Sequence, residues 1–312
     1  MFFSNMMLAA EQVGILYVIV AVGFFADKFG LYTEKTAKKC TDLLFYIVTP
    51  AKIIESFFTL EYSAESVKGL FIALGCGFLL HTVAAIVSTF VFNKCDIEKA
   101  VIFKYAGAYS NAGYMGLPLA NAIFGNEGVF YCSAVIISFQ IFCFTHGVYI
   151  MNKGKTEGKK GIEFKKLIFN PGVIGVVIGM PIFLLSINLP DIIAQPISHV
   201  GSLNSPLAML IFGTYIAHTN FKTIFKEWRI IAVAFIKLIL MPAIMLGLYK
   251  LIGINGVLLG SLMVSASAPS ATNTTIFAAK YERDAGLASQ TVAVISFLSI
   301  LTMPVVIAVS QL

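Results

Sequence analysis

Residues 110–119 read SNAGYMGLPL, and residues 265–275 read SASAPSATNTT. Each stretch interrupts an otherwise apolar segment with a proline, several small residues and an asparagine. Within a lipid bilayer, a broken helix exposes backbone N–H and C=O groups, and each costs several kcal/mol unless protein or water satisfies it. Two matched breaks, one in each half of a chain, therefore predict a cavity near the middle of the membrane where a solute contacts the freed groups. This pattern is typical of secondary transporters.

The composition indicates a membrane protein. The chain is 58% hydrophobic and only 12% charged, and its mean hydropathy is +0.87, whereas a soluble domain carries about 25% charged residues. A spanning helix needs about 20 apolar residues. Ten segments approach that length, near 8–26, 39–58, 67–92, 100–124, 127–151, 168–187, 194–217, 229–252, 255–279 and 285–310. The sequence therefore predicts an all-α integral membrane protein with ten transmembrane helices.

The basic residues lie in alternate loops between these segments. Of the 22 Lys and Arg residues, eighteen lie in loops that follow odd-numbered segments, and the loops after even-numbered segments hold only Lys68 and Lys250. Because loops rich in Lys and Arg stay in the cytoplasm, we expect a multi-pass protein of the plasma membrane. Both termini would be extracellular and the central loop cytoplasmic. The net charge of +6 follows from this loop pattern, so we expect no nucleic-acid partner.

The chain divides into two halves of equal segment number. A Lys- and Gly-rich loop at 152–166 separates residues 1–151 from residues 167–312, and each half holds five segments. An odd number of segments makes the second half enter the membrane from the opposite side, so halves of one fold form two inverted five-helix repeats. Hydroxyl–proline steps at matching places support this, because Thr49-Pro50 lies in segment two and Ser205-Pro206 in segment seven.

The two breaks carry the candidate binding residues. An asparagine amide offers donors and an acceptor, so it suits a carboxylate oxygen or the cap of a freed helix end. The amino-terminal ends of half-helices carry partial positive charge, so two such ends form an anion site without Lys or Arg. On the alternative interpretation, these side chains only satisfy the broken backbone. The polar residues at the breaks are Asn111, Tyr114, Thr272, Asn273, Thr274 and Thr275, and Gln140 in segment five could line the same cavity.

Few charged residues lie deep in the segments. Lys52 and Glu55 are three apart on one helical face and could pair. Lys237 in segment eight is the most isolated charge; either it has a functional role, or it snorkels or caps freed carbonyls. Segments four, five and nine hold no central carboxylate, which argues against a proton exchanger. We find no nucleotide-binding motif, catalytic constellation, metal site or cofactor signature, so we expect no enzyme.

The motif at 111–119, together with 267–274 and the later Ala278-Ala279-Lys280-Tyr281, resembles the auxin efflux carrier family. That family includes the plant PIN-formed auxin exporters and bacterial malate/malonate permeases. The resemblance implies the inverted five-plus-five fold of bile-acid-sodium-symporter-like and NhaA-like proteins, with segments four and nine crossing at Pro118 and Pro269. It also implies a mobile transport domain of helices 3–5 and 8–10, a homodimeric scaffold of helices 1, 2, 6 and 7, and an elevator mechanism. The family's substrate-binding asparagines match Asn111 and Asn273, and a glutamine of the plant members in segment five matches Gln140.

We therefore expect a secondary transporter, embedded in the lipid bilayer, that exports a small organic anion. The cargo would be a malate-like dicarboxylate or an auxin-like carboxylate, held by the two asparagine amides and the half-helix ends. Two alternatives remain open. One is a sodium-coupled symporter for an organic acid, and the other is a membrane sensor that binds a ligand without transport.

Overall fold

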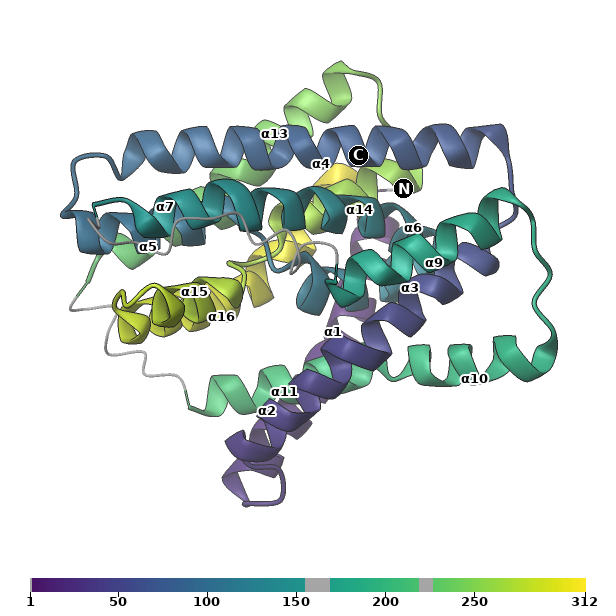
Figure 1. Cartoon of the computed structure of the whole chain (residues 1–312), viewed down its shortest axis with the longest axis horizontal. Helices are drawn as coiled ribbons and strands as arrows, with labels where there is room; N and C mark the ends of the chain where they lie inside the picture. Colours follow the sequence, from purple (N-terminus) through teal and green to yellow (C-terminus); the bar gives the residue numbers. More distant parts are fainter. Residues whose placement is uncertain (1, 155–168, 219–226) are drawn as a thin grey trace.

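The computed structural model describes residues 2–154, 169–218 and 227–312, and this part of the chain is built from helices (Figure 1). The first half contains α1 (Phe2–Lys28), α2 (Glu34–Leu43), the π-helical turn η1 (Leu44–Val48), α3 (Thr49–Phe58), α4 (Ala64–Val91), α5 (Ile97–Ala108), η2 (Ala112–Gly116), α6 (Leu117–Phe142), η3 (Cys143–Gly147) and α7 (Val148–Asn152). The second half contains α9 (Pro171–Leu184), α10 (Asp191–Ser202), α11 (Asn204–Ala217), α12 (Arg229–Phe235), η5 (Ile236–Leu240), α13 (Met241–Leu251), α14 (Gly256–Ser267), α15 (Asn273–Lys280) and α16 (Ala285–Ser310). The expected linker at 152–166 lies outside the described residues from Lys155 onward, as do Lys222 and Lys226.

Several helices have the length and composition of membrane spans. Within the described ranges, five helical segments are long and apolar enough to cross a membrane: Ala64–Val91, Ala112–Asn152, Asp191–Ala217, Arg229–Leu251 and Ala285–Ser310. Two shorter helices, Pro171–Leu184 and Gly256–Ser267, are also apolar. The helical, apolar character predicted from composition is therefore confirmed.

The segment Ala112–Asn152 reverses direction at Gly125. A straight α-helix rises about 1.5 Å per residue, so Asn111 and Gln140 would lie about 40 Å apart in a continuous helix. Instead, both side chains line the same cavity. Gly125 has φ 62° and ψ −152°, a conformation that only glycine adopts without strain. The chain therefore forms a helical hairpin whose tip lies at Gly125 and Asn126.

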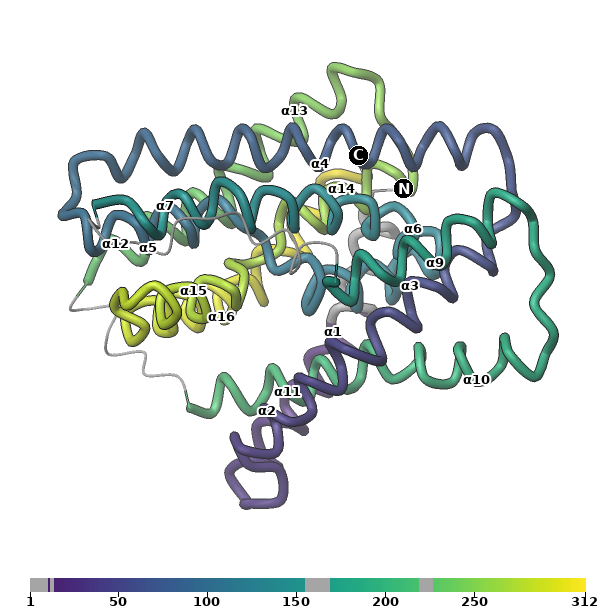
Figure 2. The backbone as a smooth tube through the Cα atoms, in the orientation of Figure 1, coloured from purple at the N-terminus to yellow at the C-terminus, as the bar shows by residue number. Residues whose placement is uncertain are grey.

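Most helix contacts fall within two groups, a first group of α1–α3 with α9–α11 and a second group of α4–α7 with α12–α16, and α6 and α16 also contact the first group. In the first group, α1 packs along α11, and α3 packs against α9 and α10. In the second group, α6 packs against α4 and α14, and α16 packs against α14 and α15. Figure 1 shows α4 along one long edge of the molecule and α10 with α11 along the opposite edge. Figure 2 shows α15 and α16 side by side, in agreement with their contacts.

Helices α1 and α11 approach each other through glycine. A Cβ atom at Gly213 would overlap the carbonyl oxygen of Val20 and lie 2.6 Å from the backbone nitrogen of Phe24. A Cβ atom at Gly23 would likewise lie 2.8 Å from the Cα of Leu210. Because lipid gives little hydrophobic drive between helices, close backbone packing at small residues holds such pairs together.

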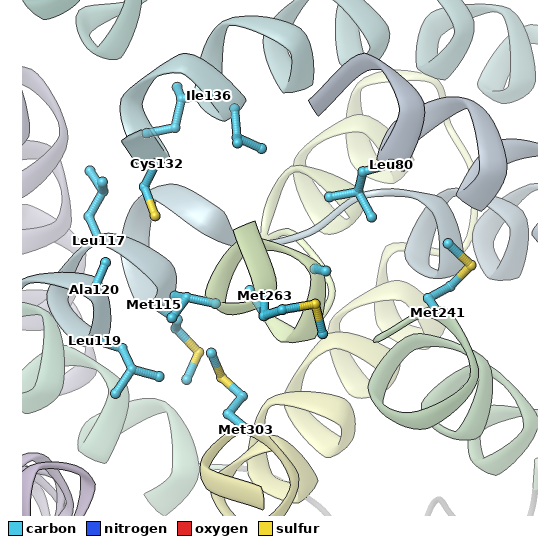
Figure 3. Close-up of a cluster of buried hydrophobic side chains, with 14 of the residues drawn as sticks. Leu80, Met115, Leu117, Leu119, Ala120, Cys132, Ile136, Met241, Met263 and Met303 are labelled. Carbon is cyan, nitrogen blue, oxygen red and sulfur yellow. The ribbon is translucent and has the colours of Figure 1, made fainter. Parts of the chain in front are cut away.

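The second group has an apolar core rich in methionine. Met115 of η2, Met263 of α14 and Met303 of α16 are all buried, and Figure 3 shows the thioether groups of Met115 and Met303 next to each other. Methionine is flexible and fills irregular gaps. The cluster therefore packs the interrupted helix η2–α6 against α14 and α16.

Charged residues join the loop ends at one end of the molecule. Arg283 pairs with Glu98 and donates to the carbonyl oxygens of Met151 (3.0 Å) and Lys153 (2.6 Å). Nearby, Glu227 accepts hydrogen bonds from Lys99 and Arg229. The chain segments near 98, 152, 228 and 283 therefore lie at one end.

The Glu227 cluster predicts an acid-sensitive contribution to stability. Burial alone would oppose ionisation, but hydrogen bonds from Lys99 and Arg229 outweigh it and hold the pKa of the Glu227 carboxyl below its usual value. A depressed carboxyl pKa stabilises the fold above the ordinary glutamate value, and that contribution is lost as pH falls through the folded-state pKa. Because both basic partners are partly exposed, we expect Glu227→Gln to lower Tm by only about 2 °C at neutral pH. Thermal unfolding at pH values from neutral to below the glutamate pKa checks this. A difference in Tm that stays constant down to the lowest pH would contradict it.

Candidate functional site

The two interrupted helices meet at a short backbone pairing. Helix α5 ends at Ala108 and α14 ends at Ser267, and Ser110 then forms an antiparallel bridge with Ser270. The backbone N–H of Asn111 donates to the carbonyl of Pro269 (2.7 Å), and that of Ala271 donates to the carbonyl of Tyr109 (2.9 Å). The two breaks therefore satisfy part of each other's freed backbone.

The crossing involves Pro269 but not Pro118. The structure pairs Ser110, not Pro118, with the second break. Pro118 lies in the first turn of α6, where a proline fits because the N–H it lacks would have no helical partner. Its carbonyl accepts a hydrogen bond from Ser205 of α11 (3.4 Å). Pro118 therefore contacts the first packing group, whereas Pro269 takes part in the crossing.

A cavity of about 40 Å³ lies beside the crossing. Its walls come from both packing groups, so the cavity lies at their boundary. The second group contributes Ser110, Asn111, Gly113, Tyr114, Ile136, Phe139, Gln140, Ala271, Thr272 and Asn273, and the first contributes Phe45, Thr49, Asn170 and Gly172.

Asn111 caps the broken helix while facing the cavity. Its side-chain oxygen accepts a hydrogen bond from the backbone N–H of Tyr114 (3.4 Å), as N-cap residues do. Its backbone carbonyl accepts from Met115 and Gly116. The oxygen is thus engaged in the cap, and the amide nitrogen is the part of the side chain suited to donate to a ligand.

The other predicted binding residues divide into two sets. Thr272 and Asn273 line the cavity at the start of α15, and the Asn273 amide also contacts the thiol of Cys143 (3.3 Å). Tyr114 lines the cavity and stacks on Phe45, with ring centroids 5.8 Å apart. Gln140 lines it too, and its buried side-chain oxygen has no hydrogen-bond partner among the described residues.

Thr274 and Thr275 do not reach the cavity. Thr274 is fully buried and lies outside the cavity lining, as does Thr275. After Asn273 the chain is helical, so successive side chains point around the helix axis rather than into one wall.

Sequence reasoning missed the wall contributed by the first group. Asn170 is the N-cap of α9, and its side-chain oxygen accepts from the N–H groups of Gly172 (3.0 Å) and Val173 (3.4 Å). Thr49 lines the cavity and accepts a hydrogen bond from Asn204 (3.2 Å). The Asn170-Pro171 step is a helix-start signal in the sequence, and it could have directed attention to this residue.

The two intramembrane lysines have different surroundings. Lys52 pairs with Glu55 (3.0 Å), as predicted, and also donates to Asn126 at the hairpin tip (2.8 Å). Lys237 is fully buried on η5 and donates to the hydroxyl of Ser110 at the crossing. Neither lysine lines the cavity. Within the described ranges, no three His, Cys, Asp or Glu side chains gather in a way that could hold a metal.

Apolar helices that break and cross beside a polar cavity define a class of integral membrane proteins that bind solutes within the bilayer. Residues 8–307 match the family model described as "Membrane transport protein", and the chain belongs to this family of transporters. This confirms the resemblance to auxin efflux carriers.

Several named relatives are similar to most of the chain. The "Uncharacterized transporter MJ1031" of Methanocaldococcus jannaschii is 27% identical, with 95% of this chain and 96% of the relative covered. The "Uncharacterized transporter YfdV" of Escherichia coli is 24% identical over the same shares. A Rhizobium meliloti protein named "Putative malonate transporter" is 25% identical over 66% of each chain.

Proposed function

We propose that this membrane transporter is a secondary carrier that exports a small organic anion. The observation that carries the proposal is the cavity in which Asn111 and Asn273, at the starts of two broken helices, face the same space as Gln140. Amide donors and helix starts suit a carboxylate. The malonate transporter named among the relatives supports a dicarboxylate such as malate or malonate, with an auxin-like carboxylate as the other cargo of this class.

We propose the ten-helix inverted topology as the frame for this activity. Helices occupy each of the ten apolar segments within the described ranges, which supports the count. Residues 1–151 and 167–312 would be the two repeats. The loop ends joined by Arg283 and Glu227 are among those rich in basic residues, and their meeting at one end supports a cytoplasmic location for that end in the plasma membrane. Both termini would then be extracellular.

The two packing groups would serve as scaffold and transport domain. The first group (α1–α3 and α9–α11) would be the scaffold, which the family resemblance pairs into a homodimer, and the second (α4–α7 and α12–α16) would carry the anion. The groups contact each other through apolar side chains, such as Phe57 with Phe130. Polar pairs such as Lys52 with Asn126 and Ser205 with Pro118 also join them. An elevator movement would break these contacts and carry the cavity across the bilayer.

The size of the cavity supports movement between the groups. A cavity needs about 10–15 Å³ of accessible space to hold one water molecule, so the cavity of about 40 Å³ has room for only a few waters. Because one wall belongs to each group, separation of the groups would enlarge it. Export needs no coupling ion, since an inside-negative potential favours anion efflux by about 2.3 kcal/mol per charge per 100 mV.

The test is efflux of labelled malate, malonate and an indole acid from proteoliposomes, with and without an imposed potential. We expect potential-driven release of one of these anions in the absence of sodium, and loss of that release in Asn273→Ala. Release that requires sodium would replace this proposal with the coupled symporter. Specific binding of an anion without any flux would instead indicate a sensor.

A further inference from the structure

The fully buried Lys237 has no role in the proposed binding of the anion by amides and helix starts. It lies on the π-helical turn η5 and is shielded from solvent. Its ammonium group donates to the Ser110 hydroxyl, and within the described ranges no carboxylate forms an ion pair with it. An unpaired charge in this position is costly, so something must offset its cost.

The surroundings of Lys237 offset part of this charge. Ser110 follows the last residue of α5 by two positions and is bridged to Ser270, which follows the last residue of α14 by three. The carboxyl ends of two half-helices therefore converge at the ammonium group, and each carries partial negative charge.

Lys237 lies directly behind the cavity wall. Ser110, its hydrogen-bond partner, is itself a lining residue, so the ammonium group lies one residue behind the cavity lining. Both side chains are buried, and burial weakens screening and strengthens the interaction between charges. By contrast, the charge of Lys52 is neutralised by Glu55.

We propose that Lys237 sets the charge preference of the cavity, which favours a dianion over a monoanion of the same size. This inference rests on the proposed function, because it names the substrate class of the same site. Lys237 does not touch the substrate; it acts through space, behind Ser110. The interaction energy between a fixed charge and a ligand is proportional to the ligand's charge. Loss of the Lys237 charge should therefore weaken the binding free energy of a dianion by twice as much as that of a monoanion.

The experiment compares malonate with malonamate, in which an amide replaces one carboxylate at almost unchanged size. Each competes with efflux of the labelled anion from proteoliposomes containing wild-type protein or Lys237→Gln, whose amide can still donate to Ser110. In the wild type we expect malonate to compete about tenfold better. In Lys237→Gln we expect malonate to weaken about a hundredfold and malonamate about tenfold, so the preference disappears.

Lys250→Gln is the matched control, because Lys250 is exposed at the far end of the same helix; it should keep the wild-type preference. Equal weakening of both compounds in Lys237→Gln would overturn the proposal, since a purely structural role would affect both alike. If that variant does not fold, the wild type still tests the proposal, because equal competition by malonate and malonamate overturns it. Absence of any anion flux in the wild type would overturn the proposed function instead, which is a separate outcome.

Discussion

Replacement of Asn111 by Asp is expected to reduce anion transport at least about a hundredfold while the protein stays folded. The side-chain oxygen of Asn111 caps the start of η2, and its amide nitrogen is the group that can donate to a carboxylate. Aspartate keeps an oxygen for the cap and is as good an N-cap as asparagine. It removes the donor, however, and places a negative charge in the wall of an anion site.

The measurement pairs transport with stability. Efflux from proteoliposomes reports the loss of activity, and thermal unfolding of the same preparation should change by less than about 1 kcal/mol, since a carboxylate at a helix start is favourable. Asn255→Asp is the matched control, because Asn255 is an exposed residue at the start of α14 and lies outside the cavity. Normal transport by Asn111→Asp would exclude Asn111 from the anion site.

The break positions could be predicted from the sequence because their cause is local. A cluster of proline and small residues with an asparagine favours a break in an apolar helix, whereas Pro181 and Pro304 lie inside continuous helices. Asn111 caps the new helix start for the same local reason. Pro269 lies at the backbone pairing between the two breaks. Pro118 shows the limit of this reasoning, because a proline at a helix start does not perturb the helix.

The wall contributed by the first group could not be predicted in this way. Phe45, Thr49 and Asn170 reach the cavity only because α3 and α9 pack against each other and against α6. Those contacts join residues distant in the sequence. The local signals at Thr49-Pro50 and Asn170-Pro171 mark helix starts, but they contain no information about what the side chains face.

The π-helical turns are a second reason why the lining of the cavity could not be predicted from the sequence. Each of the four such turns in the described ranges carries a residue at or next to the site. Phe45 in η1 and Tyr114 in η2 line the cavity. Cys143 in η3 contacts Asn273, and Lys237 in η5 contacts Ser110. A π turn inserts one extra residue, which rotates every later side chain relative to a regular helix, and such turns are frequent at functional sites. A reading based on 3.6 residues per turn therefore cannot predict these side-chain directions.

Replacement of Gly213 by Ala is expected to lower Tm by at least about 5 °C, because the added methyl group meets backbone rather than a movable side chain. The new Cβ would overlap the carbonyl oxygen of Val20 and lie 2.6 Å from the nitrogen of Phe24. Neither atom can move without shifting α1 as a whole, so the two helices must separate and lose packing along their length.

Gly247→Ala is the control, because it is not expected to lower Tm. Gly247 is exposed in α13, and a Cβ atom there would meet nothing within 4 Å. Alanine favours a helix over glycine by up to about 1 kcal/mol, so Tm should stay unchanged or rise slightly. Thermal unfolding of both variants in the same detergent separates the two effects. Equal Tm values for Gly213→Ala and the wild type would show that α1 and α11 do not depend on direct backbone contact. Since these helices form the core of the proposed scaffold, such a result would also remove the rigid surface against which the transport domain is proposed to move.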